Sequence, residues 1–356
     1  MFLNERGRII TLELPRKDMF KTILDRMSAG MDTMMVTVVA DMGSSPRSAG
    51  AHMLVGGEGR IRGTIGGGTL EYRAVQLARE FLESRKSLTK TYRLRPNGEE
   101  DLGMICGGDM ELYFQYMKGG DEKLAALMVD ILAHLKKDED TWLFTDLSSP
   151  TKWAMTVYAA DTPPRGIELS KDDIKALARN KGVLLKTGGR CLYGEPVNFA
   201  GKVFIFGGGH VAQALVPVLS TLGFRCVIFD NRKEFADREL FPTAYDVIAG
   251  DYENIYESIE TGPNDYVVIV THAYDLVVLR QVISRGHAYT GLIGSKGKVA
   301  SVKQQLVAEG IPGETLDRLN APIGLPIHSE TPEEIAISIA GEMIQRRAER
   351  RGSHGI

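Results

Sequence analysis

The sequence predicts an α/β protein whose second half is a Rossmann-like, doubly wound parallel sheet. Three observations lead to this fold class. The apolar run Val203–Phe206 is followed at once by three glycines, Gly207–Gly209, and then by a helical pattern of apolar residues. The next apolar run, Cys226–Phe229, ends in an acid, Asp230, about 20 residues after the glycines. Short apolar runs then continue to alternate with helical patterns, which is typical of parallel strands joined by right-handed crossovers.

The glycines predict a phosphate-binding turn of the pattern Gly207-x-Gly209-x-x-Ala212. The first glycine permits the tight turn, the second lets a phosphate approach the backbone, and Ala212 keeps the helix close to the strand. The N–H groups and the dipole at the helix start favour an anion, so Gly208 and His210 join the predicted site. The alternative is a doubly wound fold that binds nothing at this turn.

Further strands are expected at 246–249, 265–270 and 289–293, with helices between them. Ligands of such sheets bind at the carboxyl ends of the strands. The loops expected there carry the other candidate residues of this half: Asp230, Arg232, His272, Asp275, Gly294, Ser295, Lys296 and Lys298.

Two of these residues bear on the choice of nucleotide. Asp230 favours NAD through the ribose, whereas Arg232 would suit the 2′-phosphate of NADP. His210, His272 and Asp275 match no tight metal-ligand spacing, so no metal site is predicted. Hydrogen bonds from these side chains to a ligand or a loop are expected instead.

The N-terminal part predicts an α+β domain with glycine-rich loops. A β-rich run at 33–40 leads into an exposed loop that contains Ser45 and Arg47, and a second strand is expected at 51–55. Arg47 suits bidentate pairing with a phosphate. A second triple glycine, Gly66, Gly67 and Gly68, then opens a helix.

Such a glycine run predicts a backbone surface that an anion or a flat ligand can approach, with a plain tight turn as the alternative. Glu71 would lie in the first helical turn, either as a ligand-binding group or as a complement to the helix dipole.

Cys106 lies between glycines, ahead of a strand expected at 109–116. A thiolate in such a loop can be a nucleophile or a soft ligand, although a single cysteine is also commonly a small buried hydrophobe. From about 139 to 199 the sequence indicates only short strands and a helix near 172–178, without chemistry. Thr331, Pro332 and Glu334 predict a capped terminal helix with a packing role.

Length and composition limit the remaining possibilities. The 356 residues suggest two or three domains, with predicted divisions at 1–118, 119–197 and 198–356. A net charge of −3 gives no global basic field, so a nucleic-acid partner is not expected. A symmetric homodimer is the expected assembly.

Three cysteines form neither a disulfide framework nor a CxxC pattern, which indicates a reducing cytoplasm. The N-terminus is charged too early for a signal peptide. No run approaches the roughly 20 apolar residues of a membrane helix, so no membrane association is expected.

Taken together, the motifs resemble the XdhC/CoxI family, and the resemblance covers about residues 19 to 345. The segments that carry it follow in the expected order: Gly43–Arg47, Gly63–Gly68 with Glu71, Gly103–Gly108, Phe206–Val211, Thr271–His272 with Asp275, Gly291–Ser295, Pro322–Leu325 and Thr331–Ile335. The chain departs from the pattern of many relatives at Thr69, where they have Cys, and at Pro326, where they have Asp. A sulfur-handling mechanism would therefore rest on Cys106 alone.

The resemblance implies an accessory protein for molybdenum hydroxylases such as xanthine dehydrogenase. Such a protein would bind the molybdenum cofactor (molybdopterin), protect it while a terminal sulfido ligand is installed, and deliver it to the apoenzyme. A cysteine desulfurase and the hydroxylase would be partners. Cys106 would approach molybdenum or relay sulfur, and Gly207 and Gly209 would hold phosphate.

The alternative function is an NAD(P)-dependent oxidoreductase. It would use the Rossmann-like half, with His272 as the acid/base and Asp275 beside it. Both functions are compatible with a dinucleotide bound in that half.

Overall fold

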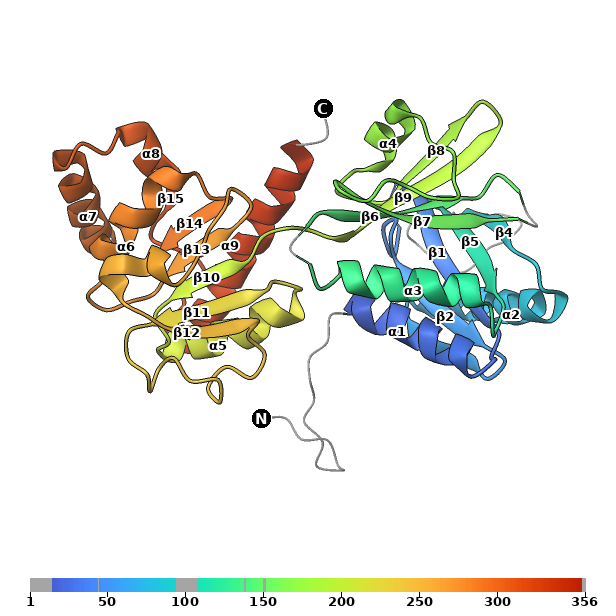
Figure 1. Ribbon diagram of the computed structural model, residues 1–356, viewed down its shortest axis with the longest axis horizontal. Coiled ribbons are helices and arrows are strands. Elements are labelled where there is room, and N and C mark those ends of the chain that lie inside the picture. The colour runs from blue at the N-terminus through green and yellow to red at the C-terminus, as the bar shows by residue number, and fades with distance from the viewer. Residues whose placement is uncertain (1–14, 44, 94–107, 138, 150–151, 354–356) are drawn as a thin grey trace. The chain divides into compact units, whose positions relative to one another are not determined.

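The computed structural model describes residues 15–43, 45–93, 108–137, 139–149 and 152–353. They form two compact units, Pro15–Phe199 and the chain from Ala200 onward (Figure 1). Each unit has its own sheets and cores, and each is described by itself.

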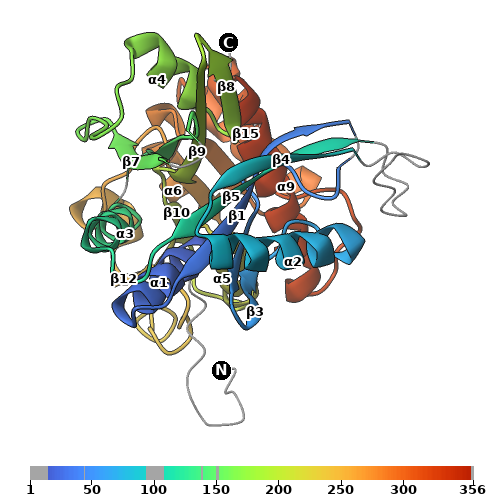
Figure 2. The ribbon, with the colours of Figure 1, turned by 90° about the vertical axis from the view of Figure 1, so that its right-hand side faces the viewer.

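The first unit begins with an antiparallel five-stranded sheet in the order β3-β2-β1-β5-β4. Its strands are β1 (Thr33–Met42), β2 (His52–Gly56), β3 (Gly59–Gly63), β4 (Leu88–Arg93) and β5 (Asp109–Met117). Figure 2 shows β1, β5 and β4 side by side, in agreement with their pairing. The expected strands at 33–40, 51–55 and 109–116 are thus present.

Helices cover both faces of this sheet, and the alternation along β1 explains why. Met34 and Val36 pack with the helix α2 (Gly68–Ser84). Met35, on the opposite face, packs with α1 (Pro15–Ser28) and α3 (Glu122–His134). Because successive strand residues face opposite ways, one continuous apolar run is buried on both sides.

The chain between about 139 and 199, where no chemistry was expected, forms a second sheet in the order β7-β6-β9-β8. Its elements are β6 (Thr141–Asp146), β7 (Ala154–Ala159), α4 (Lys171–Leu177), β8 (Val183–Thr187) and β9 (Arg190–Asn198). α3 and α1 share one apolar cluster with Met155, Val157 and Val197 of this sheet. The second sheet therefore belongs to the same compact unit, and the predicted division at residue 118 remains a prediction.

The second unit contains a parallel six-stranded sheet in the order β12-β11-β10-β13-β14-β15. Its strands are β10 (Val203–Phe206), β11 (Cys226–Asp230), β12 (Asp246–Ala249), β13 (Tyr266–Ile269), β14 (Tyr289–Leu292) and β15 (Leu319–Asn320). The doubly wound fold and the five predicted strands are confirmed, whereas the two-residue β15 was not predicted. The strand order reverses between β10 and β13, and ligands of such sheets bind at the carboxyl ends of the strands at this point.

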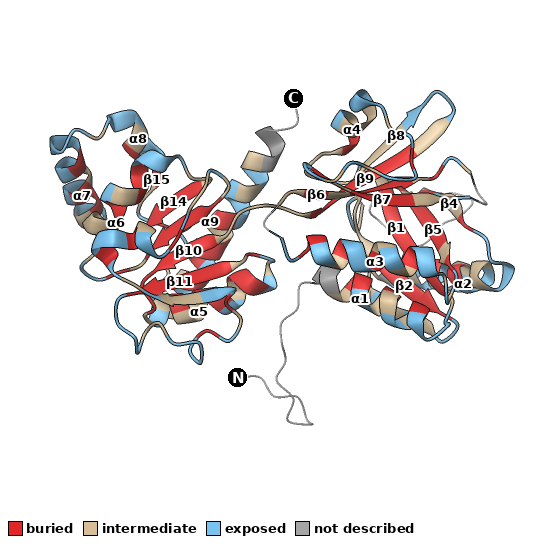
Figure 3. Ribbon diagram, in the orientation of Figure 1, coloured by how far each residue is buried: buried red, intermediate tan, exposed pale blue. Residues whose placement is uncertain are grey.

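Two cores, one on each face, bury the central strands β10 and β13 completely (Figure 3). α5 (His210–Thr221) and α9 (Pro332–Ser353) pack on one face. The other face is covered by α6 (Asp275–Val282), α7 (Lys296–Ala308) and α8 (Gly313–Asp317).

The predicted start of the last helix is confirmed. The Glu334 amide donates to Thr331 Oγ1 (3.3 Å), and the Thr331 amide donates to Glu334 Oε2 (3.1 Å), which completes a capping box. None of the helices within the described ranges is both long and apolar enough to span a bilayer.

Candidate functional site

The two loops singled out in the N-terminal half meet in the structure. Gly66, Gly67 and Gly68 have φ values of 129°, 76° and 64°, which favour glycine at all three positions. Pro46 lies directly against Gly66, since a Cβ built on Gly66 would lie 2.5 Å from Pro46 Cβ. The loop that carries Arg47 is therefore seated on the triple-glycine turn.

Glu71 holds the triple-glycine turn from within. Its Oε2 accepts the amides of Ile65 and Gly67 (3.1 Å each) and the hydroxyl of Thr64, while Arg60 Nη1 lies 3.4 Å from Oε1. Partial burial raises the pKa of Glu71, but the hydrogen bonds and the Arg60 charge outweigh it and leave this pKa below its usual value. The carboxylate is thus a charged organiser of the loop.

Asp41 plays the same part for the Arg47 loop, although no sequence pattern pointed to it. Its carboxylate accepts the Ala49 amide (2.8 Å) and lies 3.3 Å from the Ser45 hydroxyl. Ser45 Oγ is also 3.2 Å from the Arg47 carbonyl oxygen. Ser45 therefore shapes the loop, whereas the Arg47 side chain is exposed.

A cavity of about 390 Å³ opens beside Arg47. Its lining consists of an apolar group, two arginines and the ends of β2 and β3: Met19, Phe20, Met35, Arg47, Gly50, Ala51, His52, Arg62, Gly63 and Thr64. The volume is within the range of small-molecule sites.

The lining residue His52 belongs to a hydrogen-bonded group of three polar side chains that was not predicted from the sequence. His52 Nδ1 lies 3.0 Å from Thr37 Oγ1, and His52 Nε2 lies 2.8 Å from Glu195 Oε2. Thr37 and Glu195 are buried. Because Glu195 comes 143 residues later in the chain, no local motif could indicate this pair.

Cys106 lies outside the described residues, so its role remains a prediction. The two cysteines within them have unreactive surroundings. Burial raises the pKa of Cys191, and complete burial raises the pKa of Cys226 to about 12. Neither thiol is activated as a nucleophile.

In the second unit, the predicted ribose-binding acid is engaged by protein groups. Asp230 is fully buried; its Oδ2 accepts the Gly208 amide (2.8 Å), and its Oδ1 accepts the Arg232 amide (3.0 Å). The Arg232 guanidinium adds bonds of 2.9 Å to both oxygens. Burial raises the pKa of Asp230, but these bonds outweigh it and lower this pKa overall. Asp230 and Arg232, the two residues predicted to distinguish NAD from NADP, thus bind each other.

The glycine turn is also packed by backbone. A Cβ on Gly208 would lie 2.1 Å from the Phe235 carbonyl oxygen, and one on Gly207 would lie 2.9 Å from that of Val270. At Gly209, which precedes α5, no heavy atom lies within 4 Å of such a Cβ. The open part of the turn is therefore Gly209 and the start of α5 with the exposed His210.

This contrast gives a matched pair of variants. Gly208→Ala is expected to lower the free energy of unfolding by about 1–3 kcal/mol, because the added methyl group would overlap with the backbone carbonyl of Phe235 and force the backbone to shift. Gly209→Ala, with open space and φ −72°, should cost less than about 1 kcal/mol. Denaturant unfolding of both variants measures the difference; equal costs would contradict the packing described.

Asp275 is buried at the start of α6, accepts the Thr271 hydroxyl (2.6 Å) and forms an ion pair with Lys298. Ser295 caps α7 by accepting the Lys298 amide (3.2 Å). His272 and Lys296 are exposed. The loops after β13 and β14 are thus joined through Asp275 and Lys298.

Gly294, before Ser295, has Lys298 Cδ 3.0 Å from the position of an added Cβ. Within the described part of the chain, no group of three or more His, Cys, Asp or Glu residues is placed to hold a metal ion.

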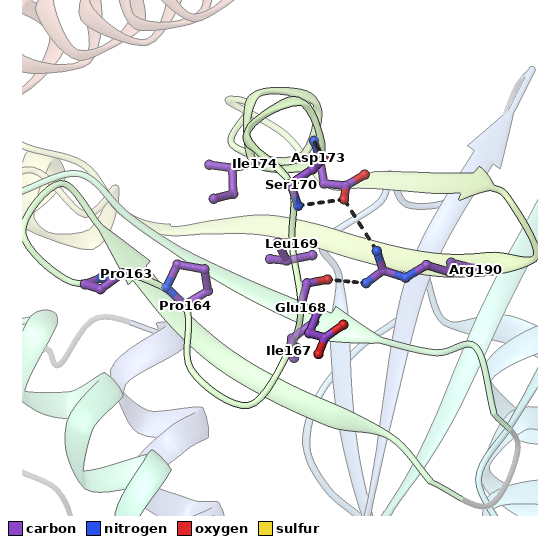
Figure 4. Close-up of a pocket in the computed structure, with 9 residues that line it drawn as sticks. All are labelled: Pro163, Pro164, Ile167, Glu168, Leu169, Ser170, Asp173, Ile174 and Arg190. Atoms are coloured by element: carbon purple, nitrogen blue, oxygen red, sulfur yellow. Dashed lines mark hydrogen bonds and ion pairs between the residues drawn. The ribbon is translucent and has the colours of Figure 1, made fainter.

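A second hollow, of about 640 Å³, lies between α4 and β9 (Figure 4). Arg190 Nη2 donates to the Glu168 carbonyl oxygen (2.5 Å), and its Nη1 lies 3.5 Å from Asp173 Oδ2. Ser170 and Asp173 also form a capping box. Because two acidic residues, Glu168 and Asp173, line it beside a single arginine, this hollow is the weaker candidate for an anionic ligand.

Comparison with known proteins identifies relatives along both units. Residues 203–343 match the model of the XdhC Rossmann domain, and residues 27–93 match that of the XdhC and CoxI family. The chain is 25% identical over 343 residues to a Bacillus subtilis protein described as a probable xanthine dehydrogenase subunit, covering 92% of this chain and 97% of that protein. It is 23% identical to the molybdenum cofactor insertion chaperone PaoD of Escherichia coli, with coverage of 93% and 89%.

Two further matches differ in what they show. YqeB of Escherichia coli is 26% identical over 312 residues; this is 87% of the present chain but 43% of YqeB, so the chain spans less than half of that relative. A crystal structure described as a xanthine dehydrogenase from Bacillus halodurans superposes with a TM-score of 0.77 at 24% identity, covering 95% of this chain and 97% of that one. This likeness shows that the whole fold is shared. The chain belongs to the XdhC and CoxI family.

Proposed function

We propose that this protein is a maturation factor for a xanthine dehydrogenase-type molybdenum hydroxylase. It binds the molybdenum cofactor and delivers it to the apoenzyme in the reducing cytoplasm. The proposal is supported by the match along both units to the XdhC and CoxI family, together with the similarity to a molybdenum cofactor insertion chaperone. Its other partner is a cysteine desulfurase, and the assembly is a symmetric homodimer.

The geometry of the first unit supports this function. The cofactor contains a flat pterin and a phosphate, and its bound metal supplies the redox chemistry of the client enzyme. The cavity beside Arg47 offers apolar walls and two arginines, and its lining includes no carboxylate among the described residues. Arg47 and Arg62 would hold the anionic end, while Glu71 and Asp41 keep the flanking loops in place.

We do not extend the proposal to a nicotinamide-dependent oxidoreductase. The acid that would bind the ribose, Asp230, already accepts hydrogen bonds from Gly208 and Arg232. His272 is exposed, and no hydrogen bond to a second catalytic group positions it among the described contacts. No specific observation therefore favours that function over the first.

The test is the ligand content of the protein purified without oxygen from cells that make the cofactor. We expect molybdenum and pterin at about one per chain, measured by metal mass spectrometry and by pterin fluorescence of a denatured extract. A nucleotide without molybdenum or pterin would contradict the proposal.

Cys106→Ser tests the thiol by the same measurement. We expect molybdenum retention to fall, because a soft ligand or sulfur carrier is lost. Cys191→Ser is the control, since that thiol is partly buried and its pKa is raised. Unchanged retention and delivery in Cys106→Ser, with the fold intact, would remove Cys106 from the mechanism.

A further inference from the structure

The cavity between α1 and the β2–β3 hairpin has a charge pattern of its own. Its lining contains two basic side chains, Arg47 and Arg62, and the described lining residues include no carboxylate. Arg62 is half-exposed and reaches Asp18 of α1 (Nη1 to Oδ2, 3.0 Å). An anion that enters here meets one guanidinium group from the Ser45–Arg47 loop and one from β3, and guanidinium pairs well with phosphate.

The apolar part of the lining is buried in the core of the first unit. Met19, Phe20 and Met35 are each less than 10% exposed and belong to the core that α1 shares with the sheet. Phe20 lines the cavity with its neighbour Met19, so a flat ring has an aromatic and thioether surface to contact.

His52 closes the cavity without offering a free hydrogen-bonding nitrogen. Thr37 and Glu195 occupy its two ring nitrogens, at 3.0 and 2.8 Å. Gly63, beside it, has no room for a side chain, because an added Cβ would lie 2.3 Å from the His52 carbonyl oxygen. The polar chemistry of the lining is thus concentrated in the two arginines.

We infer that this cavity binds a flat nitrogen heterocycle that carries a phosphomonoester, with the phosphate on Arg47 and Arg62 and the ring on Phe20 and Met35. This inference rests on the proposed function, in which the ligand is the pterin phosphate of the cofactor. It adds Arg62, Phe20 and Met35 to the residues expected from the sequence. A purine nucleotide shares the same chemistry and is the other source of such a ligand.

The experiment measures the affinity of the full-length protein for 6-hydroxymethylpterin monophosphate by fluorescence titration. Arg47→Gln and Arg62→Gln are each expected to weaken binding about tenfold or more, because each removes charge-assisted hydrogen bonds. Arg79→Gln is the matched control: Arg79 is an exposed arginine of α2 that does not line the cavity. It should leave the affinity unchanged. Thermal unfolding of each variant checks the fold.

Three comparison ligands complete the test. The same pterin without its phosphate should bind at least about tenfold more weakly, and inorganic phosphate should compete only at much higher concentration. Equal binding of the phosphate-free pterin, or wild-type affinity in both arginine variants, would overturn the inference. Tighter binding of GMP than of the pterin phosphate would overturn the pterin as the ligand.

The outcome is distinguishable from that of the proposed function. Arginine variants that keep the wild-type content of molybdenum and pterin would refute this cavity but leave the maturation role standing. Conversely, a wild-type protein without molybdenum or pterin, whose probe affinity still depends on Arg47 and Arg62, would refute the maturation role and support the cavity.

Discussion

Replacing Asp230 with alanine is expected to lower the free energy of unfolding of the Rossmann-like unit by about 3 kcal/mol, because a buried, fully hydrogen-bonded carboxylate is removed from its charged partner. The Gly208 amide would lose its acceptor inside the protein, and Arg232 would lose three hydrogen bonds, one from its amide and two from its guanidinium. The melting temperature should fall by roughly 6–12 °C for a unit of this size. Differential scanning calorimetry measures it.

The same variant should change the pH dependence of stability. Hydrogen bonds and the Arg232 charge hold the pKa of Asp230 below its usual value in the folded state. When a carboxyl group has a lower pKa in the folded state than in the unfolded state, it contributes its full stabilisation at pH values above the unfolded-state pKa, which is near 4. This contribution is lost as the pH falls through the folded-state pKa. The difference in the free energy of unfolding between wild type and Asp230→Ala should therefore be largest near pH 7 and become smaller below about pH 4.

Glu234→Ala is the control for charge alone, since Glu234 is an exposed acid four residues further on. It should change the stability by no more than about 0.5 kcal/mol. If Asp230→Ala changed the stability as little as Glu234→Ala, the carboxylate would not stabilise the glycine turn. Binding of a ribose would then again be a possible role for Asp230.

The Rossmann-like unit could be predicted from sequence because its signals are local. Each buried strand is a short apolar run, and three consecutive glycines mark the turn after β10. β15 was missed because two residues, Leu319 and Asn320, are too few to form a pattern. Asp230 was placed correctly at the end of β11, but the sequence could not show that Arg232, two residues on, occupies both of its oxygens.

Only the local features of the candidate site in the first unit could be predicted from the sequence. Gly66–Gly68 and Arg47 are recognisable from residue type and loop context. His52, Glu195 and the cavity depend on contacts between distant segments. Glu195 contacts His52 across 143 residues, and α1 contributes Met19 and Phe20 to a cavity that is also lined by residues of the sheet. No periodicity or spacing encodes such contacts, so only the fold reveals them.

Gly66→Ala is expected to disrupt the loops that flank this site. An added Cβ would lie 2.5 Å from Pro46 Cβ and 3.6 Å from Arg47 Cγ, at a φ of 129° that L-residues avoid. The steric overlap and the backbone strain together should cost roughly 2–5 kcal/mol. Because the Arg47 loop is displaced, we also expect molybdenum and pterin content to fall about tenfold or more.

Gly67→Ala separates the two causes. Gly67 also has a positive φ, 76°, but no heavy atom lies within 4 Å of its added Cβ. It therefore carries the strain without the overlap, and Gly66→Ala should exceed its cost by about 1–3 kcal/mol. Denaturant unfolding gives the stabilities, and the ligand content of the same preparations gives the effect on binding.

A double-mutant cycle with Pro46→Gly identifies the contact itself. Removing the Pro46 ring takes away the atom that the new methyl group meets, so Gly66→Ala should cost at least about 1 kcal/mol less in that background. Cofactor retention should recover in parallel if Arg47 acts from this loop. Additive effects of the two changes would mean that Pro46 and Gly66 do not act through their contact, and the loop that carries Arg47 would then owe its position to Asp41 and Ser45 alone.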